Sequence, residues 1–303
     1  MMSFSMKVKQ ELMSDIPAGR HCQIALLTAL ICTAGQISID SERRLRLGFS
    51  TEHEDIKELV SELYKRLFGF TELTESRQVY KVLETVKLLH LTEDILKRKR
   101  KVLDEGALRW DSIVLQRVCC KRAFLKGVFL TSGSINNPEK AYHLEMVFLS
   151  PWMANETCAI LKDMDIEGKI VQRKKYDVVY IKDGSMIVDF LNVIGAPLAL
   201  MEMENVRILK DVKNLVNRRV NCETANINKT VSASRKQIED IQLIERMVGF
   251  GNLPKPLRQM AELRLNEPDA SLAELGEMLD PPVTKSGVNH RLRKLSQIAS
   301  DLR

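Results

Sequence analysis

One segment of this chain occurs twice, and this internal repeat restricts the folds that the chain can adopt. The sequence ALLTALICTAGQI at residues 25–37 and the sequence AFLKGVFLTSGSI at residues 123–135 lie 98 residues apart. Their identical positions are Ala25/Ala123, Leu27/Leu125, Thr33/Thr131, Gly35/Gly133 and Ile37/Ile135. Because most of the positions between them are also apolar, the repeat predicts two similar helix-led units in tandem.

The segments that follow each copy occur in the same order. Alternating apolar and polar residues predict strands, and apolar residues at helical spacing predict amphipathic helices. The predicted elements are strands at 43–51 and 142–150, helices at 52–70 and 151–166, strands at 80–89 and 176–184, and helices at 92–100 and 184–194. Each copy is therefore predicted to be built as helix, strand, strand, helix, strand, strand, helix.

Small residues in the two apolar helices would allow the helices to pack closely against each other. These residues are Ala29, Ala34 and Gly35 in the first copy and Gly127, Ser132 and Gly133 in the second. With the sequence LKGVFLTSGS in its second copy, the chain resembles the LAGLIDADG homing endonuclease fold. The resemblance implies an α+β fold in which a tandem LAGLIDADG-like αββαββα repeat pair forms the first part of the chain.

The positions that would bind a catalytic metal in such a nuclease are occupied by Ala34 and Ser132. Nucleases of that family carry an acidic residue there, which holds the metal that activates water for phosphodiester cleavage. A methyl or hydroxyl group cannot replace a carboxylate as ligand of a hard cation. We therefore expect no catalytic residue, and we name these two the degenerate nuclease positions. A residual metal-dependent endonuclease that recruits Asp40 or Glu145 remains an alternative.

The cysteines and histidines give no sign of a metal site in the linear sequence. There is no C-x-x-C pair, and no cysteine has metal-ligand spacing from one of the five histidines. We therefore predict no zinc site, no disulfide framework and no cofactor, which fits a reducing cytoplasm. The six cysteines are Cys22, Cys32, Cys119, Cys120, Cys158 and Cys222.

Charge and hydropathy favour a cytoplasmic protein with a polyanionic partner. The chain has 46 Lys and Arg against 40 Asp and Glu, which gives a net charge of +6. The apolar run after Arg20 and His21 resembles a signal peptide, but Glu11 and Asp15 precede it and a second copy occurs in mid-chain. The run is also too short to span a membrane, so no membrane partner is expected.

A separate all-α domain is predicted toward the end of the chain, because no strand pattern follows Gly195. Its first segment, 211–251, has apolar residues at helical spacing, but the Asn-rich stretch 217–229 is expected to be weakly helical at best. The predicted division is 1–102 for an N-terminal segment and the first repeat, 103–200 for the second repeat, 201–220 for a linker, and 221–303 for a helical DNA-binding domain.

The last part of that domain, at about 270–303, has the plan of a helix-turn-helix. A short helix at 271–279 opens with a capping box formed by Ser271 and Glu274, and the turn DPPV leads to a basic helix at 284–303. Asn289 can pair with an adenine edge and Arg293 with a guanine edge. The predicted DNA-binding residues are Ser271, Thr284, Lys285, Ser286, Asn289, His290, Arg291, Arg293 and Lys294. An ordinary amphipathic helix is the alternative for 284–303.

Other basic residues are candidates for auxiliary phosphate contacts, since Lys and Arg neutralise the nucleic-acid backbone. One run lies at 97–101, between the two copies, and another at 172–176. The predicted auxiliary DNA contacts are Arg173, Lys174, Lys175, Arg218 and Arg219. Solvated surface charge is the alternative for all of them.

Several longer segments together resemble the WhiA family of bacterial sporulation and cell-division regulators. They are SFSMKVKQEL, FLKGVFLTSGSINNPEKAYHLE, NCETANINK and SLAELGEMLDPPVTKSGVNHRLRKL, and they occur in that order along nearly the whole chain. The resemblance implies a DNA-binding protein of Gram-positive bacteria. It also implies roles in sporulation septation in actinomycetes and in cell division and chromosome segregation in Firmicutes.

We therefore expect a non-enzymatic regulator that binds double-stranded DNA at promoter or chromosomal sites. It would be cytoplasmic and nucleoid-associated, a monomer or weak oligomer, and free of metal and cofactor. Other transcription or division proteins are open as further partners. The alternatives are the residual endonuclease and a protein-interaction scaffold that does not bind DNA.

Overall fold

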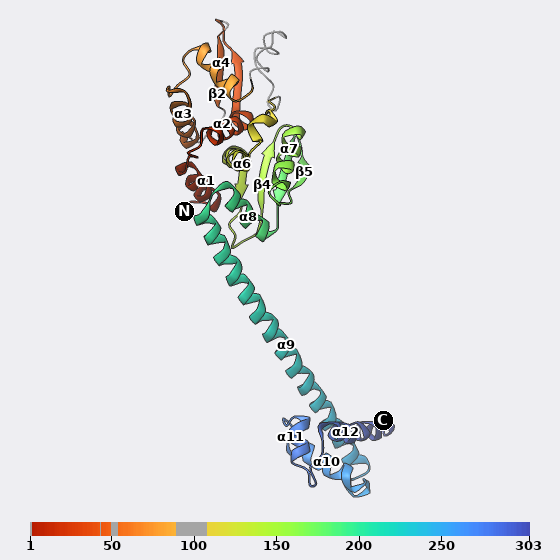
Figure 1. Cartoon of the computed structure of the whole chain (residues 1–303). Helices are drawn as coiled ribbons and strands as arrows, with labels where there is room; N and C mark the ends of the chain where they lie inside the picture. The colour runs from red at the N-terminus through yellow and green to blue at the C-terminus, as the bar shows by residue number, and fades with distance from the viewer. Residues whose placement is uncertain (1, 43, 50–53, 89–107) are drawn as a thin grey trace. The chain divides into compact units, whose positions relative to one another are not determined.

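The structure is a computed structural model that describes residues 2–42, 44–49, 54–88 and 108–303 (Figure 1). The chain divides into two compact units, Met1–Lys210 and Asp211–Arg303. We call them the N-terminal unit and the C-terminal unit and describe each by itself. None of the helices in the described residues combines the length and the apolar character needed to cross a membrane.

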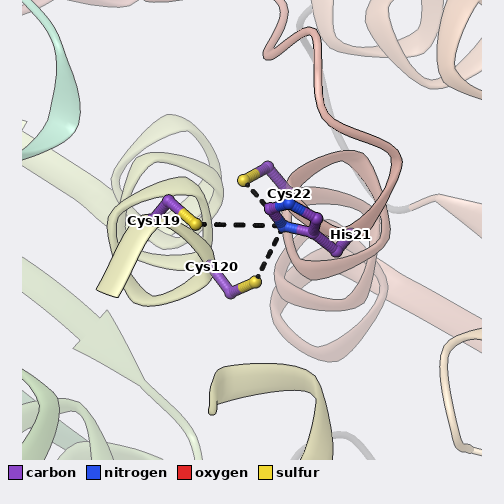
Figure 2. Close-up of side chains that lie close together, drawn as sticks. All are labelled: His21, Cys22, Cys119 and Cys120. Atoms are coloured by element: carbon purple, nitrogen blue, oxygen red, sulfur yellow. Dashed lines mark hydrogen bonds between the residues drawn. The ribbon is translucent and has the colours of Figure 1, made fainter. Parts of the chain in front are cut away.

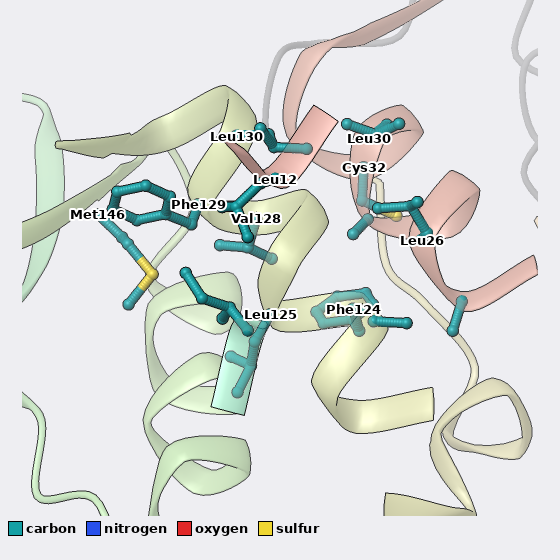
Figure 3. Packing of buried hydrophobic residues seen from close by; sticks show 14 of the residues in the cluster. Leu12, Leu26, Leu30, Cys32, Phe124, Leu125, Val128, Phe129, Leu130 and Met146 are labelled. Atoms are coloured by element: carbon teal, nitrogen blue, oxygen red, sulfur yellow. The ribbon is translucent and has the colours of Figure 1, made fainter. Parts of the chain in front are cut away.

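Two central helices, one from each sequence copy, form the core of the N-terminal unit (Figures 1 and 3). They are α2 (Arg20–Ala34) and α6 (Val118–Ser132), and α1 (Phe4–Ser14) packs against α6. A Cβ atom on Gly127 would lie 2.7 Å from the Cβ of Ala29 and 2.9 Å from the carbonyl oxygen of Leu26. The helices therefore approach too closely for a side chain at this point, as the small residues predict.

Gly35 and Gly133 have a role different from the one expected of them. A Cβ on Gly35 would lie 2.4 Å from the carbonyl oxygen of Ile31, and one on Gly133 would lie 2.3 Å from the Phe129 side chain. In each case the obstacle belongs to the helix that has just ended, not to the neighbouring helix. These glycines therefore permit the change from helix to strand, while Gly127 permits the close contact between helices.

The second copy has all seven predicted elements. After α6 come β3 (Gly133–Ile135), β4 (Leu144–Phe148), α7 (Pro151–Lys162), β5 (Lys169–Arg173), β6 (Tyr176–Ile181) and α8 (Gly184–Ile194). The four strands form an antiparallel sheet in the order β3-β4-β6-β5. Leu144, Met146 and Phe148 alternate along β4 and are buried in the core, as their period of two predicts.

The first copy departs from the prediction after its second helix. It contains β1 (Gly35–Ile39) and β2 (Leu45–Phe49) as an antiparallel pair, then α3 (Glu54–Phe68) and α4 (Ser76–Thr85). The strand predicted at 80–89 is wrong, because most of this segment lies in α4. The buried residues Val79, Val82, Leu83 and Val86 follow helical spacing, and a capping box starts the helix at Glu75, so the pattern outweighs the β-branched composition. The helix predicted at 92–100 and the basic run 97–101 lie outside the described residues.

The C-terminal unit is entirely helical in the structure. It contains the later part of α9 (Pro197–Met247), a 3₁₀ turn η2 (Phe250–Asn252), and the helices α10 (Lys255–Asn266), α11 (Leu272–Glu277) and α12 (Lys285–Asp301). Its core brings one face of α9 together with the other three helices. The core residues are Ile241, Ile244, Leu257, Met260, Ala261, Leu275, Leu279, Val288, Leu292, Leu295 and Ala299.

The α9 helix corrects the expectation of weak helicity at 217–229, since it runs without interruption for 51 residues. The Asn-rich stretch is helical with exposed side chains, and local contacts support it. Arg219 and Glu223 form an ion pair of 3.1 Å at i,i+4 spacing, and the Thr230 hydroxyl donates to the carbonyl of Asn226. The predicted linker segment 201–220 also lies within this helix.

Candidate nucleic-acid interface

The short helix α11 is fixed by the capping box that the sequence predicts. The Ser271 hydroxyl accepts from the backbone N–H of Glu274 at 3.3 Å, and the Glu274 carboxylate accepts from the backbone N–H of Ser271 at 2.8 Å. The bond from the Ser271 backbone lowers the pKa of Glu274 and keeps the carboxylate ionised near the positive end of the helix. The Ser271 hydroxyl, predicted to contact DNA, is therefore used as a helix cap.

A tight turn then brings α12 against α11. The backbone N–H of Val283 donates to the carbonyl of Gly276 at 2.9 Å, and a Cβ on Gly276 would lie 2.1 Å from the Val283 carbonyl oxygen. Thr284 caps α12 by accepting from the N–H of Gly287 at 3.3 Å. Because Val288 and the other core residues of α12 are buried, the opposite face of the helix is held toward solvent.

The outer face of α12 carries most of the residues predicted to contact DNA. Lys285, Ser286, His290, Arg293 and Lys294 are exposed, while Asn289 and Arg291 are half-buried. Within the described residues, none of these seven side chains makes a hydrogen bond or an ion pair. The face therefore combines unpaired cations with amide and hydroxyl groups, which is the chemistry that phosphates and base edges require.

A buried arginine that no sequence pattern indicated holds the helix-turn-helix together. Arg264 on α10 is 2% exposed, and it donates to the side-chain oxygen of Gln237 at 3.0 Å and to the carbonyl of Ala270 at 2.5 Å. Burial lowers the pKa of its guanidinium. The side chain joins α9 to the loop that starts α11, so it positions the motif without contacting solvent.

A second buried charge lies on α9. Asp240 is 1% exposed and accepts from the guanidinium of Arg303 at 2.7 Å. The bond ties the end of the chain that follows α12 to α9. The sequence did not predict this ion pair, because Asp240 is one of many polar residues along an amphipathic helix.

The auxiliary basic residues differ in how free their charges are. Arg173 forms an ion pair of 2.8 Å with Glu145, and His143 lies 3.2 Å from the same carboxylate. Burial opposes ionisation of Glu145, but the hydrogen bonds from His143 and Arg173 outweigh it and lower the pKa. Lys174 lies in the exposed turn between β5 and β6, and the Lys175 ammonium lies 5.2 Å from the ring centre of Tyr176.

The other two auxiliary candidates, Arg218 and Arg219, are exposed on α9. Arg219 is held by Glu223, whereas Arg218 makes no ion pair within the described part of the chain. The structure therefore leaves Lys174 and Arg218 as the cations of this group without a charged or aromatic partner among the described residues.

The degenerate nuclease positions lie at the ends of α2 and α6. The hydroxyls of the preceding residues, Thr33 and Thr131, are 2.6 Å apart, so the two helix ends meet. The hydroxyl of Ser132 donates to the carbonyl of Val128 at 2.8 Å, and the methyl group of Ala34 offers no ligand. This end of the helix pair therefore presents no carboxylate from either position.

The acids considered as replacement ligands are both paired with arginine. Asp40 lies 3.0 Å from each of the guanidinium groups of Arg44 and Arg46. Hydrogen bonds, chiefly from the Arg44 backbone, hold the pKa of Asp40 far below its usual range. Glu145 is paired with Arg173 as described above. Each carboxylate thus already has a positive partner in the place where a metal ion would have to bind.

Four cysteine and histidine residues come together in the structure, although the linear sequence shows no metal-ligand spacing. His21, Cys22, Cys119 and Cys120 form one cluster in which the four possible ligand atoms all lie within 4.8 Å of one another (Figure 2). Ligand spacing within short segments does not predict it, because the residues come from two helices far apart in sequence. The internal repeat does predict the cluster, because its offset of 98 residues matches His21 with Cys119 and Cys22 with Cys120.

Comparisons with known proteins cover the whole chain. A family model for the WhiA LAGLIDADG-like domain matches residues 23–102 and 121–213, and one for the WhiA C-terminal HTH domain matches residues 216–299. The chain belongs to the WhiA family. It is 44% identical to a probable cell division protein WhiA from Lachnoclostridium phytofermentans, over 100% of both chains. The corresponding protein of Thermoanaerobacter sp. is 43% identical, with 100% of this chain and 98% of the relative covered.

A solved WhiA-family structure supports the same assignment. The crystal structure of full-length DUF199/WhiA from Thermatoga maritima is 28% identical, covers 99% of each chain and has a TM-score of 0.56. The predicted fold class is therefore confirmed: an α+β LAGLIDADG-like part is followed by a helical part with a helix-turn-helix. The residue-level DNA contacts remain predictions.

Proposed function

We propose that this chain is a non-enzymatic, DNA-binding regulator of cell division, and that α12 reads the DNA sequence. The observation that carries the proposal is the exposed face of α12, whose cations have no protein partner among the described residues. The helix-turn-helix family match and the cell-division names of the relatives support it.

The spacing on α12 suggests how the roles divide. Asn289 and Arg293 are four residues apart, so they lie one above the other on the same side of the helix. Asn can form two hydrogen bonds with adenine and Arg two with guanine in the major groove. Lys285 and Ser286 lie in the first turn, where free backbone N–H groups favour a phosphate. The first turn would fix the helix on the backbone while Asn289 and Arg293 contact bases.

The test is a fluorescence-anisotropy titration with duplexes that the wild-type protein selects from a random pool. We expect the double variant Asn289→Ala, Arg293→Ala to weaken binding by roughly 1–3 kcal/mol for each of the two side chains that pairs with a base, and to abolish the preference among the selected sequences. Arg258→Ala is the matched control, because Arg258 is a half-exposed cation on α10 that pairs with Glu262. Unchanged binding by the double variant, or an equal loss in the control, would reject α12 as the reader.

We further propose that Arg173, Lys174 and Lys175 of the N-terminal unit supply a second, weaker DNA contact, and that Arg218 and Arg219 of the C-terminal unit add phosphate contacts of their own. The substitution Glu145→Gln removes the charge that holds Arg173 without removing a cation. It should therefore tighten binding to non-specific duplex at low salt and make the salt dependence steeper, by up to about one unit of slope. An unchanged slope in Glu145→Gln, together with an unchanged slope in Lys174→Ala, would restrict DNA binding to the C-terminal unit.

The absence of nuclease activity belongs to the same proposal, and the paired state of Asp40 and Glu145 supports it. Purified protein incubated with supercoiled plasmid and Mg²⁺ should leave the plasmid uncut. A reproducible cut that disappears in Asp40→Asn or Glu145→Gln would establish the residual endonuclease instead.

The cellular part of the proposal is nucleoid association with roles in cell division, chromosome segregation and, in sporulating relatives, sporulation septation. It also includes a monomeric or weakly oligomeric state. A fluorescent fusion in live cells should coincide with the nucleoid, and depletion should raise the fraction of cells without DNA. Light scattering after gel filtration measures the mass. A diffuse fusion with normal DNA content after depletion would favour the protein-interaction scaffold.

A further inference from the structure

The cluster of His21, Cys22, Cys119 and Cys120 lies where the first turns of α2 and α6 meet (Figure 2). Each helix provides two neighbouring residues, and all three thiols surround one imidazole nitrogen. The His21 Nδ1 atom lies 3.2 Å from the Cys22 sulfur, 3.3 Å from the Cys120 sulfur and 3.9 Å from the Cys119 sulfur. Four potential ligands from the two sequence copies thus converge on one place.

These distances match those between ligands around a tetrahedral zinc ion. Zinc binds sulfur at about 2.3 Å and imidazole nitrogen at about 2.0–2.1 Å, so the nitrogen and sulfur ligands of a tetrahedral site lie roughly 3.6 Å apart. The three nitrogen-to-sulfur distances here fall on both sides of that value. The limit of 4.8 Å on all pairs also allows the sulfur atoms to take up the roughly 3.8 Å separation of a zinc site with small rotamer changes.

The donor set selects the kind of metal. Three thiolates and one imidazole are soft to borderline ligands, which suit zinc and exclude hard cations such as Mg²⁺ and Ca²⁺. A single disulfide would use two of the three sulfurs and would leave the third sulfur and the imidazole without a role. Zinc in a Cys₃His site uses all four groups and completes its coordination with no water, as structural zinc sites do.

The surroundings allow a metal ion to enter. Cys22 and Cys120 are buried, while His21 and Cys119 are exposed, so one side of the cluster faces solvent. A cavity of about 250 Å³, lined in part by His21, Cys120 and Arg117, adjoins it. The positive N-terminal ends of both helices would stabilise the negative charge of a three-thiolate site.

We propose that His21, Cys22, Cys119 and Cys120 bind one structural zinc ion that joins the two repeats at the N-terminal ends of their central helices. This site lies at the opposite end of α2 and α6 from the degenerate nuclease positions, about 20 Å away by helix length. It is therefore separate from the place where a nuclease of this fold would hold its metal. It is also independent of the proposed DNA binding, because it uses none of the residues assigned to DNA.

The first experiment measures metal content in untagged full-length protein, purified under reducing conditions and then passed through gel filtration. Elemental analysis should give one zinc per chain in the wild type. The variants Cys22→Ser and Cys120→Ser should each lose most of it. Cys158→Ser and Cys222→Ser are matched controls, because these two thiols lie on α7 and α9 outside the cluster, and both should keep one zinc.

A second experiment keeps the proposal testable if a cysteine variant fails to fold. Wild-type protein is stripped with a chelator, kept reduced, and titrated with Co²⁺ alone. The expected result is saturation at one equivalent with the intense visible bands of tetrahedral cobalt and a thiolate-to-cobalt charge-transfer band, all displaced by Zn²⁺. Zinc should also raise the thermal midpoint of the stripped protein, since it binds only the folded arrangement.

Three results would overturn the proposal. The first is a reduced, stripped protein that binds no metal, and the second is an equal metal uptake in Cys22→Ser, Cys120→Ser and the wild type. The third is a disulfide among Cys22, Cys119 and Cys120, detected by mass spectrometry without reductant, together with no zinc uptake after reduction. The thiol count by a chromogenic reagent separates these cases, because zinc should protect three of the six cysteines.

Discussion

The contact between α2 and α6 at Gly127 yields a prediction whose size follows from the structure. Gly127 faces Ala29 across the pair, and a Cβ atom at 127 would lie 2.7 Å from the Ala29 Cβ and 2.9 Å from the carbonyl oxygen of Leu26. Favourable carbon contacts require about 3.5–4.0 Å. Gly127→Val would therefore force the helices apart by close to an ångström, and the Leu26 backbone cannot move aside as a flexible side chain could.

The expected cost is the difference between two effects. Forcing extra methyl groups into a packed core costs about 1–3 kcal/mol. Replacing glycine by valine in a helix returns only about 0.4 kcal/mol of propensity. We therefore expect Gly127→Val to lower the free energy of unfolding of the N-terminal unit by about 2 kcal/mol. For a unit of this size, that corresponds to a fall of about 4–8 °C in the thermal midpoint.

Tryptophan fluorescence during urea unfolding measures this unit selectively, because the only two tryptophans, Trp110 and Trp152, lie within it with their ring centres 4.5 Å apart. The rescue variant combines Gly127→Val with Ala29→Gly, which removes the shortest contact. Ala29→Gly alone costs about 1 kcal/mol in helix propensity, so the double variant should be about 1 kcal/mol more stable than the sum of the two single-variant losses predicts. A loss below about 0.5 kcal/mol in Gly127→Val, or strictly additive losses in the double variant, would refute the close-contact argument.

Substitutions at three further residues test contacts elsewhere in the chain. Lys126→Met should cost about 1–3 kcal/mol in the same fluorescence assay, because the buried ammonium donates a charge-assisted hydrogen bond to the carbonyl of Asp15 that methionine cannot make. Glu11→Ala should speed hydrogen exchange in the first turn of α9, since the carboxylate accepts from two backbone N–H groups there, and Glu11→Gln should speed it less. Asp240→Asn should lower the protection of α12 amides by about 1–2 kcal/mol, less than for a fully buried pair because the arginine partner is half-exposed. Unchanged fluorescence or unchanged exchange would reject the respective contact.

Local patterns in the sequence located α6, β4, α7, β6 and α8 of the second copy and the helix-turn-helix, but not the fully exposed β5. In both, the buried positions follow one period without conflict, and capping residues such as Ser271 and Thr284 mark where helices begin. The segment 80–89 shows where such reasoning fails. Its β-branched residues favour a strand and its buried spacing favours a helix, and only the packing of α4 in the folded chain decides between them. The length of α9 could not be predicted either. Asn and Thr have low helix propensity, but the neighbouring helical turns and ion pairs such as Arg219–Glu223 keep the segment helical.

Some residues of the candidate sites could be predicted from local spacing, and others depend on contacts between segments distant in sequence. The outer face of α12 could be predicted because its spacing is local, whereas Arg264 and Asp240 could not, since each is buried by helices distant in sequence. The partners of Arg173 were equally hidden, because strand pairing brings β4 and β5 to the two sides of β6.

The cluster of His21, Cys22, Cys119 and Cys120 could be predicted only in part from the sequence. No local spacing predicts it, yet the repeat offset that revealed the scaffold also places Cys22 opposite Cys120. If two helices pair about an approximate twofold axis, residues at equivalent positions near that axis must meet. Thr33 and Thr131 meet in this way at one end of the helix pair, and Ala29 and Gly127 meet near its middle. The same relation applies to His21 and Cys119 at the other end. An internal repeat therefore predicts contacts as well as fold. Residues at matched positions of the two central helices are expected to contact each other, even where the spacing within one segment predicts no site.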